Sequence, residues 1–358
     1  PEGPAGADGT VGTHGTDGTN GTEGTNGVDG NVTCLECHGK AIKDKIGVEF
    51  TRSQHYLGDI AVSYAGGRGS CGPCHGHEQY VEYSITGDNE NVTNPSPWKC
   101  ITCHNIHMAF DSTDYAFRLG DGFTLMSDGT TAVDEQNNNV CMMCHQARRE
   151  GSYYDKYTTA ESFTRTFTGS DIAAYQNAAV GPQGSATLNG TMDTLTVVFD
   201  VPTTHAYISS THAGPHHGPQ ANVMLGLGGY TASAGAPYSS HSGGCVLCHM
   251  GSASGHSFIP EEDNCVGCHT AKTTEMDAIA TRLEAVAHEL ESIHAIHIDA
   301  TWETGDPLFG AAHPVYASIT RDEFQAFWNF MLVMEDRSLS AHNPTYVKAL
   351  LTQAEANL

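Results

Sequence analysis

The chain has few positively charged residues. Its 358 residues include 16 Lys and Arg against 41 Asp and Glu, which gives a formal net charge of −25. Nucleic acids and anionic membrane surfaces attract basic patches, so this charge balance argues against both as partners. The chain also lacks any run of 18 apolar residues, and the sequence therefore predicts no membrane-spanning helix.

No cysteine lies outside one short motif. The twelve cysteines form six Cys-x-x-Cys-His pentapeptides, called motifs 1 to 6 here, at residues 34–38, 71–75, 100–104, 141–145, 245–249 and 265–269. This spacing is the attachment signature of c-type haem. Zinc sites, disulfide frameworks and thioredoxin-like dithiols explain paired cysteines, but not a histidine after every second cysteine. The motifs therefore predict covalent haem.

Two sets of side chains are assigned to six c-type haems by these motifs. The cysteines that form thioethers are Cys34, Cys37, Cys71, Cys74, Cys100, Cys103, Cys141, Cys144, Cys245, Cys248, Cys265 and Cys268. The proximal iron ligands are His38, His75, His104, His145, His249 and His269. Covalent haem is attached outside the cytoplasm, so we expect an exported, extracellular or cell-surface protein. The chain begins at Pro1 without an apolar signal segment, as a processed form does.

Charged residues are scarce and glycine is abundant. Charged side chains make up 16% of the chain and 40 residues are glycine, which is not typical of a large helical enzyme. Six haems would supply flat apolar surfaces in place of part of the side-chain core. We therefore expect a multihaem cytochrome c fold, mostly loop and coil wrapped round a haem chain. Its few helices are expected to be concentrated at the C-terminus, with minimal β structure.

The chain divides into an N-terminal extension and a haem domain. Residues 1–30 have glycine at every third position from Gly3 to Gly30, with only two prolines. Such a Gly-x-x period suits an extended chain, either as a flexible spacer or as a segment that docks onto another subunit. Residues 31–358 form the predicted hexahaem cytochrome domain, whose helical C-terminal part is 272–358.

Patterns outside the motifs predict a few regular elements. Residues 194–199 are typical of a short strand, and the rest of 150–240 is predicted as loop. An apolar stripe predicts an amphipathic helix over 274–298. A capping box, Thr320 with Glu323, starts a second helix, and Asn343-Pro344 starts a last one that runs to Leu358.

Fifteen histidines lie outside the motifs, enough to supply every iron with a second imidazole. Two histidine ligands close the iron to substrate and give a lower potential than His/Met ligation. Local context favours six of them as distal ligands: His55, His107, His217, His241, His256 and His342. His216 is the rival of its neighbour His217. His14, alone in the glycine repeat, is the leading candidate for a ligand donated to a neighbouring subunit, ahead of His77 and His107.

The last third of the chain resembles the superfamily that contains the pentahaem nitrite reductases. The resemblance is carried by the segments from His241 to Met250, Gly255 to Phe258, motif 6 and Asp336 to Tyr346. It implies distal roles for His241, His256 and His342. The chain has no Cys-x-x-Cys-Lys motif, which those reductases often use at the active-site haem.

The chain also resembles the outer-surface cytochromes that polymerise into conductive filaments in its number of haem motifs and its glycine-rich character. The resemblance rests on six haem motifs, low predicted secondary structure and surplus histidines. It implies stacked haems and identical subunits as partners. We therefore expect extracellular electron transfer through six bis-histidine haems to redox proteins or extracellular acceptors, and not an enzyme. A multihaem reductase of nitrite or another small oxyanion, and a monomeric surface or periplasmic carrier, are the alternatives.

Overall fold

The computed structural model describes most of the chain after the glycine repeat. The described residues are 9, 10, 12, 35, 38–168, 184–188, 194–231, 235–238, 243–251, 255–260, 272–299, 301–303 and 308–358. Most of the predicted extension over 1–30 therefore lies outside the described residues. Among the helices that the structure describes, none combines the length and the apolar character needed to cross a membrane.

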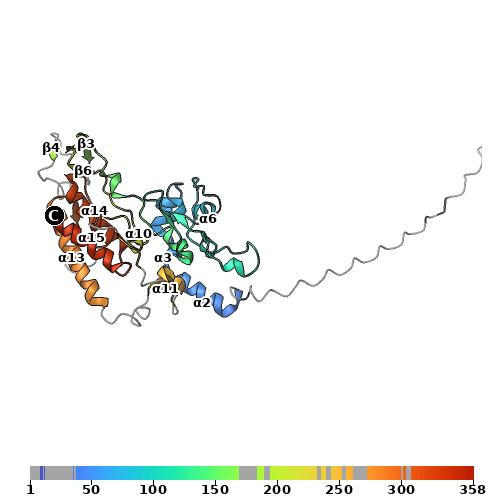
Figure 1. The fold of residues 1–358 in the computed structure, drawn as a ribbon. Coiled ribbons are helices and arrows are strands. Elements are labelled where there is room, and N and C mark those ends of the chain that lie inside the picture. The colour runs from blue at the N-terminus through green and yellow to red at the C-terminus, as the bar shows by residue number, and fades with distance from the viewer. Residues whose placement is uncertain are drawn as a thin grey trace, which may run out of the picture.

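Short helices joined by loops make up the part that contains motifs 2 to 5 (Figure 1). The α-helices are α2 (Lys40–Phe50), α3 (Gln54–Leu57), α4 (Asp59–Ala61), α5 (Gly72–His75), α6 (His77–Thr86), α7 (Cys100–Cys103), α8 (Asn139–Met142), α10 (Gln220–Leu225) and α11 (Gly244–His249). A π-helical turn, η1 (Val62–Gly66), and 3₁₀ turns η2 (Ser112–Tyr115), η3 (Gln136–Asn138), η4 (Gly151–Tyr153) and η6 (Gly255–Ser257) connect them. Helices are thus less concentrated at the C-terminus than the sequence predicted. Most of these elements are too short for a 3.6-residue apolar period to show.

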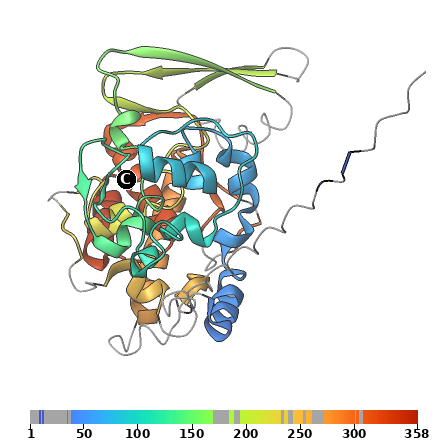
Figure 2. The ribbon, with the colours of Figure 1, turned by 90° about the vertical axis from the view of Figure 1, so that its right-hand side faces the viewer.

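The segment 150–240, predicted as loop around one strand, contains a three-stranded antiparallel sheet in the order β3-β5-β4. Its strands are β3 (Glu161–Thr168), β4 (Gly184–Leu188) and β5 (Thr194–Val201), and they lie together at one end of the molecule (Figure 2). Strand β5 buries alternate residues, among them Val197 and Phe199. These pack with Tyr207 in a separate apolar cluster that joins the sheet to the body.

Three further two-stranded sheets brace the body. They pair β1 (Phe123–Thr124) with β2 (Ala132–Val133), β6 (His205–Ile208) with β9 (Ala317–Thr320), and β7 (Ile296–Ile298) with β8 (Ala312–Pro314), all antiparallel. The β6–β9 pair links the end of the three-stranded sheet to the C-terminal helices. The fold therefore contains more β structure than the minimal amount predicted.

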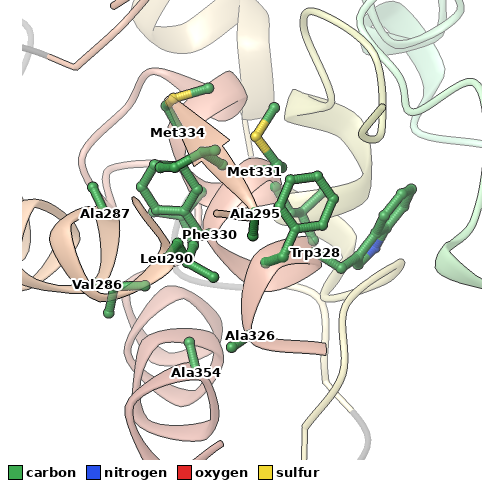
Figure 3. Packing of buried hydrophobic residues seen from close by; sticks show 14 of the residues in the cluster. Val286, Ala287, Leu290, Ala295, Ala326, Trp328, Phe330, Met331, Met334 and Ala354 are labelled. Carbon is green, nitrogen blue, oxygen red and sulfur yellow. The ribbon is translucent and has the colours of Figure 1, made fainter. Parts of the chain in front are cut away.

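The largest side-chain core lies among three C-terminal helices, α13 (Lys272–Ser292), α14 (Arg321–Asp336) and α15 (Pro344–Ala356) (Figure 1). Figure 3 shows Val286 and Leu290 of α13 beside Phe330 and Met334 of α14, with Ala354 of α15 beneath them. Almost the whole of α14 is buried. This region forms the largest apolar cluster among the described residues.

The predicted helix starts at the C-terminus are confirmed, but one predicted end is wrong. Thr320 accepts the backbone N–H of Glu323 at 3.3 Å, and the Glu323 carboxylate accepts that of Thr320 at 2.7 Å. Asn343 caps α15 by accepting the N–H of Tyr346 at 3.1 Å. Helix α13, predicted to run to 298, ends at Ser292 because His294 turns to φ +59 and the next residues form β7.

Substitution of a core leucine tests how much this helical region contributes to the stability of the protein. Leu350 is completely buried in the cluster between α13, α14 and α15, whereas Leu358 is 40% exposed. Leu350→Ala is expected to lower the free energy of unfolding by about 2–5 kcal/mol, because it loses transfer energy and leaves a cavity. Leu358→Ala is the matched control and is expected to change it by less than about 0.5 kcal/mol. Guanidinium unfolding of the haem-loaded protein, followed by far-UV circular dichroism, measures both, and equal losses would contradict the core assignment.

Candidate haem-binding cavity

Motifs 2 to 5 are described completely, and each forms about one turn of helix. The histidine N–H bonds to the carbonyl of the first cysteine four residues earlier, at 3.1 Å in motif 2 and 3.0 Å in motifs 3 and 4. Residues three and four apart share one helix face, so both sulfurs and the imidazole point to the same side. This is the arrangement that a porphyrin needs for two thioethers and one axial ligand. Of motif 1 the structure describes His38, while Cys34, Cys37 and all of motif 6 lie outside the described residues.

Among the described residues, a large cavity connects motifs 2 to 5. Its volume is about 2000 Å³, and both cysteines and the histidine of motifs 2 to 5 line it, together with His38. Apolar side chains such as Phe50, Trp98 and Phe117 form other parts of the wall. Pockets for small ligands usually measure about 300–1,000 Å³, so this cavity is large enough for several flat cofactors.

Inside the cavity, motif histidines face histidines from elsewhere in the chain. Five such pairs have ring centres 5.9–6.5 Å apart: His38–His107 (6.0 Å), His55–His145 (6.1 Å), His75–His216 (5.9 Å), His104–His256 (6.5 Å) and His249–His342 (6.3 Å). A metal between two imidazoles, with bonds of about 2.0 Å and about 1.2 Å from nitrogen to ring centre, separates the centres by about 6.4 Å. The pairs therefore fit irons held between two histidines.

Hydrogen bonds on the far side of three motif imidazoles orient them for ligation, whereas the buried Nδ1 of His75 has no partner among the described residues. Nδ1 of His104 donates to the Tyr115 carbonyl and Nδ1 of His249 to the Phe258 carbonyl, both at 2.8 Å. Because a carbonyl oxygen only accepts, Nδ1 carries the proton and Nε2 keeps its lone pair for a metal. In motif 4, Nδ1 of His145 lies 3.2 Å from Oε1 of Gln220. Such outer hydrogen bonds are typical of metal-ligating histidines.

Two of the facing histidines have the same kind of support. Nδ1 of His342 bonds Oδ1 of Asp336 at 2.6 Å, and the Asp336 side chain is fully buried. Nδ1 of His216 lies 3.3 Å from the backbone carbonyl of His217. The carboxylate of Asp336 makes the His342 imidazole a more basic ligand, while the carbonyl beside His216 supplies only a dipole.

Burial keeps most of the paired imidazoles neutral. It lowers the pKa of His55 to about 4, with a further contribution from His145, and lowers the pKa of His75 to about 4, helped by His216. Burial alone would also lower the pKa of His342, but the charge and hydrogen bond of Asp336 raise it overall. A histidine must be neutral to bind a metal, so the lowered pKa values reduce competition from protons.

The distal candidates from the sequence divide into three groups. His55, His107, His256 and His342 each lie opposite a motif histidine. His217 does not: its neighbour His216 faces His75, and Nδ1 of His217 bonds Oε2 of Glu335 at 2.9 Å with the ring largely exposed. His216 has φ +86, and this backbone turn directs the two adjacent rings differently. His241 and His14 lie outside the described residues.

His77, a candidate for a donated ligand, has its Nδ1 2.7 Å from the Thr102 hydroxyl.

The side chains that form hydrogen bonds with the paired histidines were not predicted from the sequence. Asp336 and Gln220 were not singled out, although Asp336 lies in the C-terminal segment that carried the resemblance. Of these two side chains, Asp336 is six residues from His342 and could have been predicted from the sequence, whereas Gln220 is 75 residues from His145.

No protein-family model matches the chain. Curated relatives are the C-type polyheme cytochrome OmcB of two strains of Geobacter sulfurreducens, 24% identical over 357 aligned positions that cover 80% of this chain and 43% of the relative. The chain thus spans less than half the length of these relatives. Among solved structures it is similar to the Outer Cell Wall Cytochrome OcwA (15% identity, TM-score 0.43, 86% of this chain and 49% of that one). It is also similar to an undecaheme cytochrome from the S-layer of Carboxydothermus ferrireducens (15%, 0.45, 85% and 40%). The two structural similarities are too low to carry a conclusion. The sequence relationship, with its haem motifs, supports a multihaem c-type cytochrome.

Proposed function

We propose that the protein is an extracellular electron carrier with six c-type haems, each iron held between two imidazoles. The observation that carries this proposal is the set of five histidine pairs at 5.9–6.5 Å within one cavity. Irons with both axial positions filled exchange electrons without binding a substrate. The protein then contributes spacing, insulation and the tuning of potentials.

For four of the five sites with a facing histidine pair, the proposed distal ligands are among those predicted from the sequence. They are His107 for motif 1, His256 for motif 3, His55 for motif 4 and His342 for motif 5. For motif 2 we propose His216 instead of His217, because His216 is the ring that faces His75. For motif 6 the proposed ligand is His241, on the basis of the sequence alone.

The oxidised holoprotein tests closed ligation directly. Electron paramagnetic resonance and optical spectra are expected to contain only low-spin ferric haem, with six haems per chain by intact mass. A high-spin fraction in the unmodified protein would instead favour the reductase of a small oxyanion, which needs one open iron. Fewer than six haems by mass would contradict the haem count.

Assembly into a filament of identical subunits is a further part of the proposal, with His14 as the donated ligand. It is supported by the number of histidines and by the glycine repeat in which His14 lies. Light scattering of the wild type and of His14→Ala tests it. Large assemblies that shrink on substitution are expected, whereas a monomeric wild type would favour the single-carrier alternative.

The buried carboxylate behind His342 gives a prediction for one potential. Asp336→Asn is expected to raise the reduction potential of the motif 5 site, because a charged partner makes the imidazole a stronger donor to ferric iron. A tenfold change in relative affinity corresponds to about 59 mV for one electron, which sets the expected scale. Spectroelectrochemical titration measures the shift.

Glu335→Gln is the matched control for this prediction. It removes the same charge from His217, which faces no motif histidine among the described residues. The titration curve of this variant is expected to match that of the wild type. If both variants shift one component equally, His217 also ligates an iron and the proposed ligand set is incorrect.

A further inference from the structure

Motifs of the cavity contact one another in its interior. Motifs 2 and 4 lie against each other there, and Cys74 and Cys144 are the residues at the contact. The two motifs also interlock, since Sγ of Cys74 lies 3.6 Å from the Met143 carbonyl and Sγ of Cys144 lies 3.8 Å from the Pro73 carbonyl. The second cysteine of each motif therefore lies against the backbone of the other motif.

Motif 4 also contacts motif 5. Cys245 packs against the apolar cluster that contains Met142 of motif 4. Motif 5 is fixed there by Asn138, whose side chain accepts the N–H of Val246 at 3.1 Å. Gly244 has φ +56, and a Cβ at this position would lie 2.5 Å from Asn138, so only glycine permits this close approach.

From this geometry we infer that motif 4 is the junction of the electron path, in contact with motif 2 through Cys144 and with motif 5 through Met142. The inference rests on the proposed function. Each cysteine would be bonded to a porphyrin edge, so motifs in contact would bring their porphyrin edges close together. Motif 4 contacts both motif 2 and motif 5 and therefore has two neighbours. An electron that passed between two bound haems would oxidise one iron from Fe(II) to Fe(III) and reduce the next from Fe(III) to Fe(II), with no bond broken and no proton required.

Tyr80 occupies the space around this junction. It is 2% exposed and packs with Val140 and Met143, in a cluster that also includes Cys103, Cys141 and Cys144. Its hydroxyl has no hydrogen-bond partner among the described residues. The ring excludes water from between the motifs and holds them at a fixed separation, which makes Tyr80 a positioning residue. Cys103 in the same cluster places motif 3 beside the junction as a branch.

The test uses an electron trap at the junction. His55→Met is expected to raise the potential of the motif 4 site, because His/Met ligation gives a higher potential than two histidines. One equivalent of dithionite electrons then reduces that iron first and makes it diamagnetic. The ferric electron paramagnetic resonance signals of motifs 2 and 5 are identified by their shifts in His216→Met and His342→Met. Both signals are expected to narrow, because reduction of the motif 4 iron removes their magnetic coupling to it.

His107→Met is the matched control, since it places the same trap at motif 1, whose described histidine pair takes no part in the cysteine contacts. Reducing this trap is expected to leave the signals of motifs 2 and 5 unchanged. The inference is contradicted if reduction of the motif 4 trap narrows the signal of neither motif 2 nor motif 5. It is also contradicted if reduction of the motif 1 trap narrows both signals. If the methionine variants shift no potential at all, the ligand assignments of the proposed function fail instead.

A measurement on the unsubstituted protein covers the case in which His55→Met does not fold. Intact mass and peptide mapping of the holoprotein are expected to find a thioether on each of Cys74, Cys144, Cys141 and Cys245. Disulfides between the facing cysteines would overturn the junction, because those sulfurs would then link motifs without a porphyrin. Dipolar electron paramagnetic resonance of the partly reduced wild type is expected to show one iron with two close neighbours, and a simple set of separate pairs would contradict the inference.

Discussion

Replacing His216 with alanine is expected to convert one haem iron from low spin to high spin. His216 faces His75 with the ring centres 5.9 Å apart, and no other described histidine outside the motifs takes this place. Without its imidazole the iron binds only water or nothing on that side, and either gives a weaker ligand field. Under the proposed haem count the high-spin fraction is about one sixth of the total iron. Low-temperature electron paramagnetic resonance of the oxidised protein measures this fraction.

His217→Ala separates this expectation from a general disturbance of the loop. The two histidines are adjacent, but Nδ1 of His217 bonds Glu335 and its ring is largely exposed. We therefore expect His217→Ala to leave every iron low spin. The opposite outcome, a high-spin signal from His217→Ala and none from His216→Ala, would restore the ligand predicted from the sequence.

Removing the two cysteines of motif 4 is expected to be the most damaging change in the haem region. Cys141→Ala with Cys144→Ala eliminates both thioethers, so intact mass should decrease by one haem. The residues around this motif are buried, with Asn139, Met142 and Met143 each at most 2% exposed. Met142 also lines the cavity, so the loss of a haem that packs against this wall is expected to be comparable to a large-to-small core substitution, about 3–5 kcal/mol. Denaturant unfolding followed by circular dichroism measures the loss.

The corresponding double variant in motif 5 is the matched comparison. Cys245→Ala with Cys248→Ala also removes one haem, but Leu247 between them is 54% exposed. We expect the same decrease in mass with a clearly smaller decrease in unfolding free energy. If the motif 5 variant loses as much unfolding free energy as the motif 4 variant, the burial around Met142 and Met143 does not make motif 4 more important for stability.

The haem motifs and the C-terminal helix starts were predictable because each is a local pattern. Two cysteines and a histidine at fixed spacing make one helical turn, and the Thr320–Glu323 capping box needs only four residues. The ends of elements were less predictable. The apolar stripe of α13 continues to Ile293, but the positive φ of His294 stops the helix there. Nothing in the apolar period indicates that turn.

Distal ligands were harder to predict because each pairing is spatial. His55 faces His145 of the fourth motif although the second motif is nearer in sequence, and His342 reaches motif 5 from the far end of the chain. The choice between His216 and His217 depends on one backbone angle, which the sequence does not specify. Strand β3 was missed for another reason: most of its residues are exposed, so it has no alternation of buried and exposed positions to recognise.

The cavity of about 2000 Å³ has a consequence for how the protein matures. Most of the largest apolar cluster is made of side chains from α13, α14 and α15, whereas motifs 2 to 5 line a cavity large enough for several cofactors. We therefore expect the C-terminal region to acquire its native packing from the polypeptide alone. The haem region should compact only as the covalent attachments are made, so that the attachment machinery acts on a largely open chain and the order of ligation sets the order of folding.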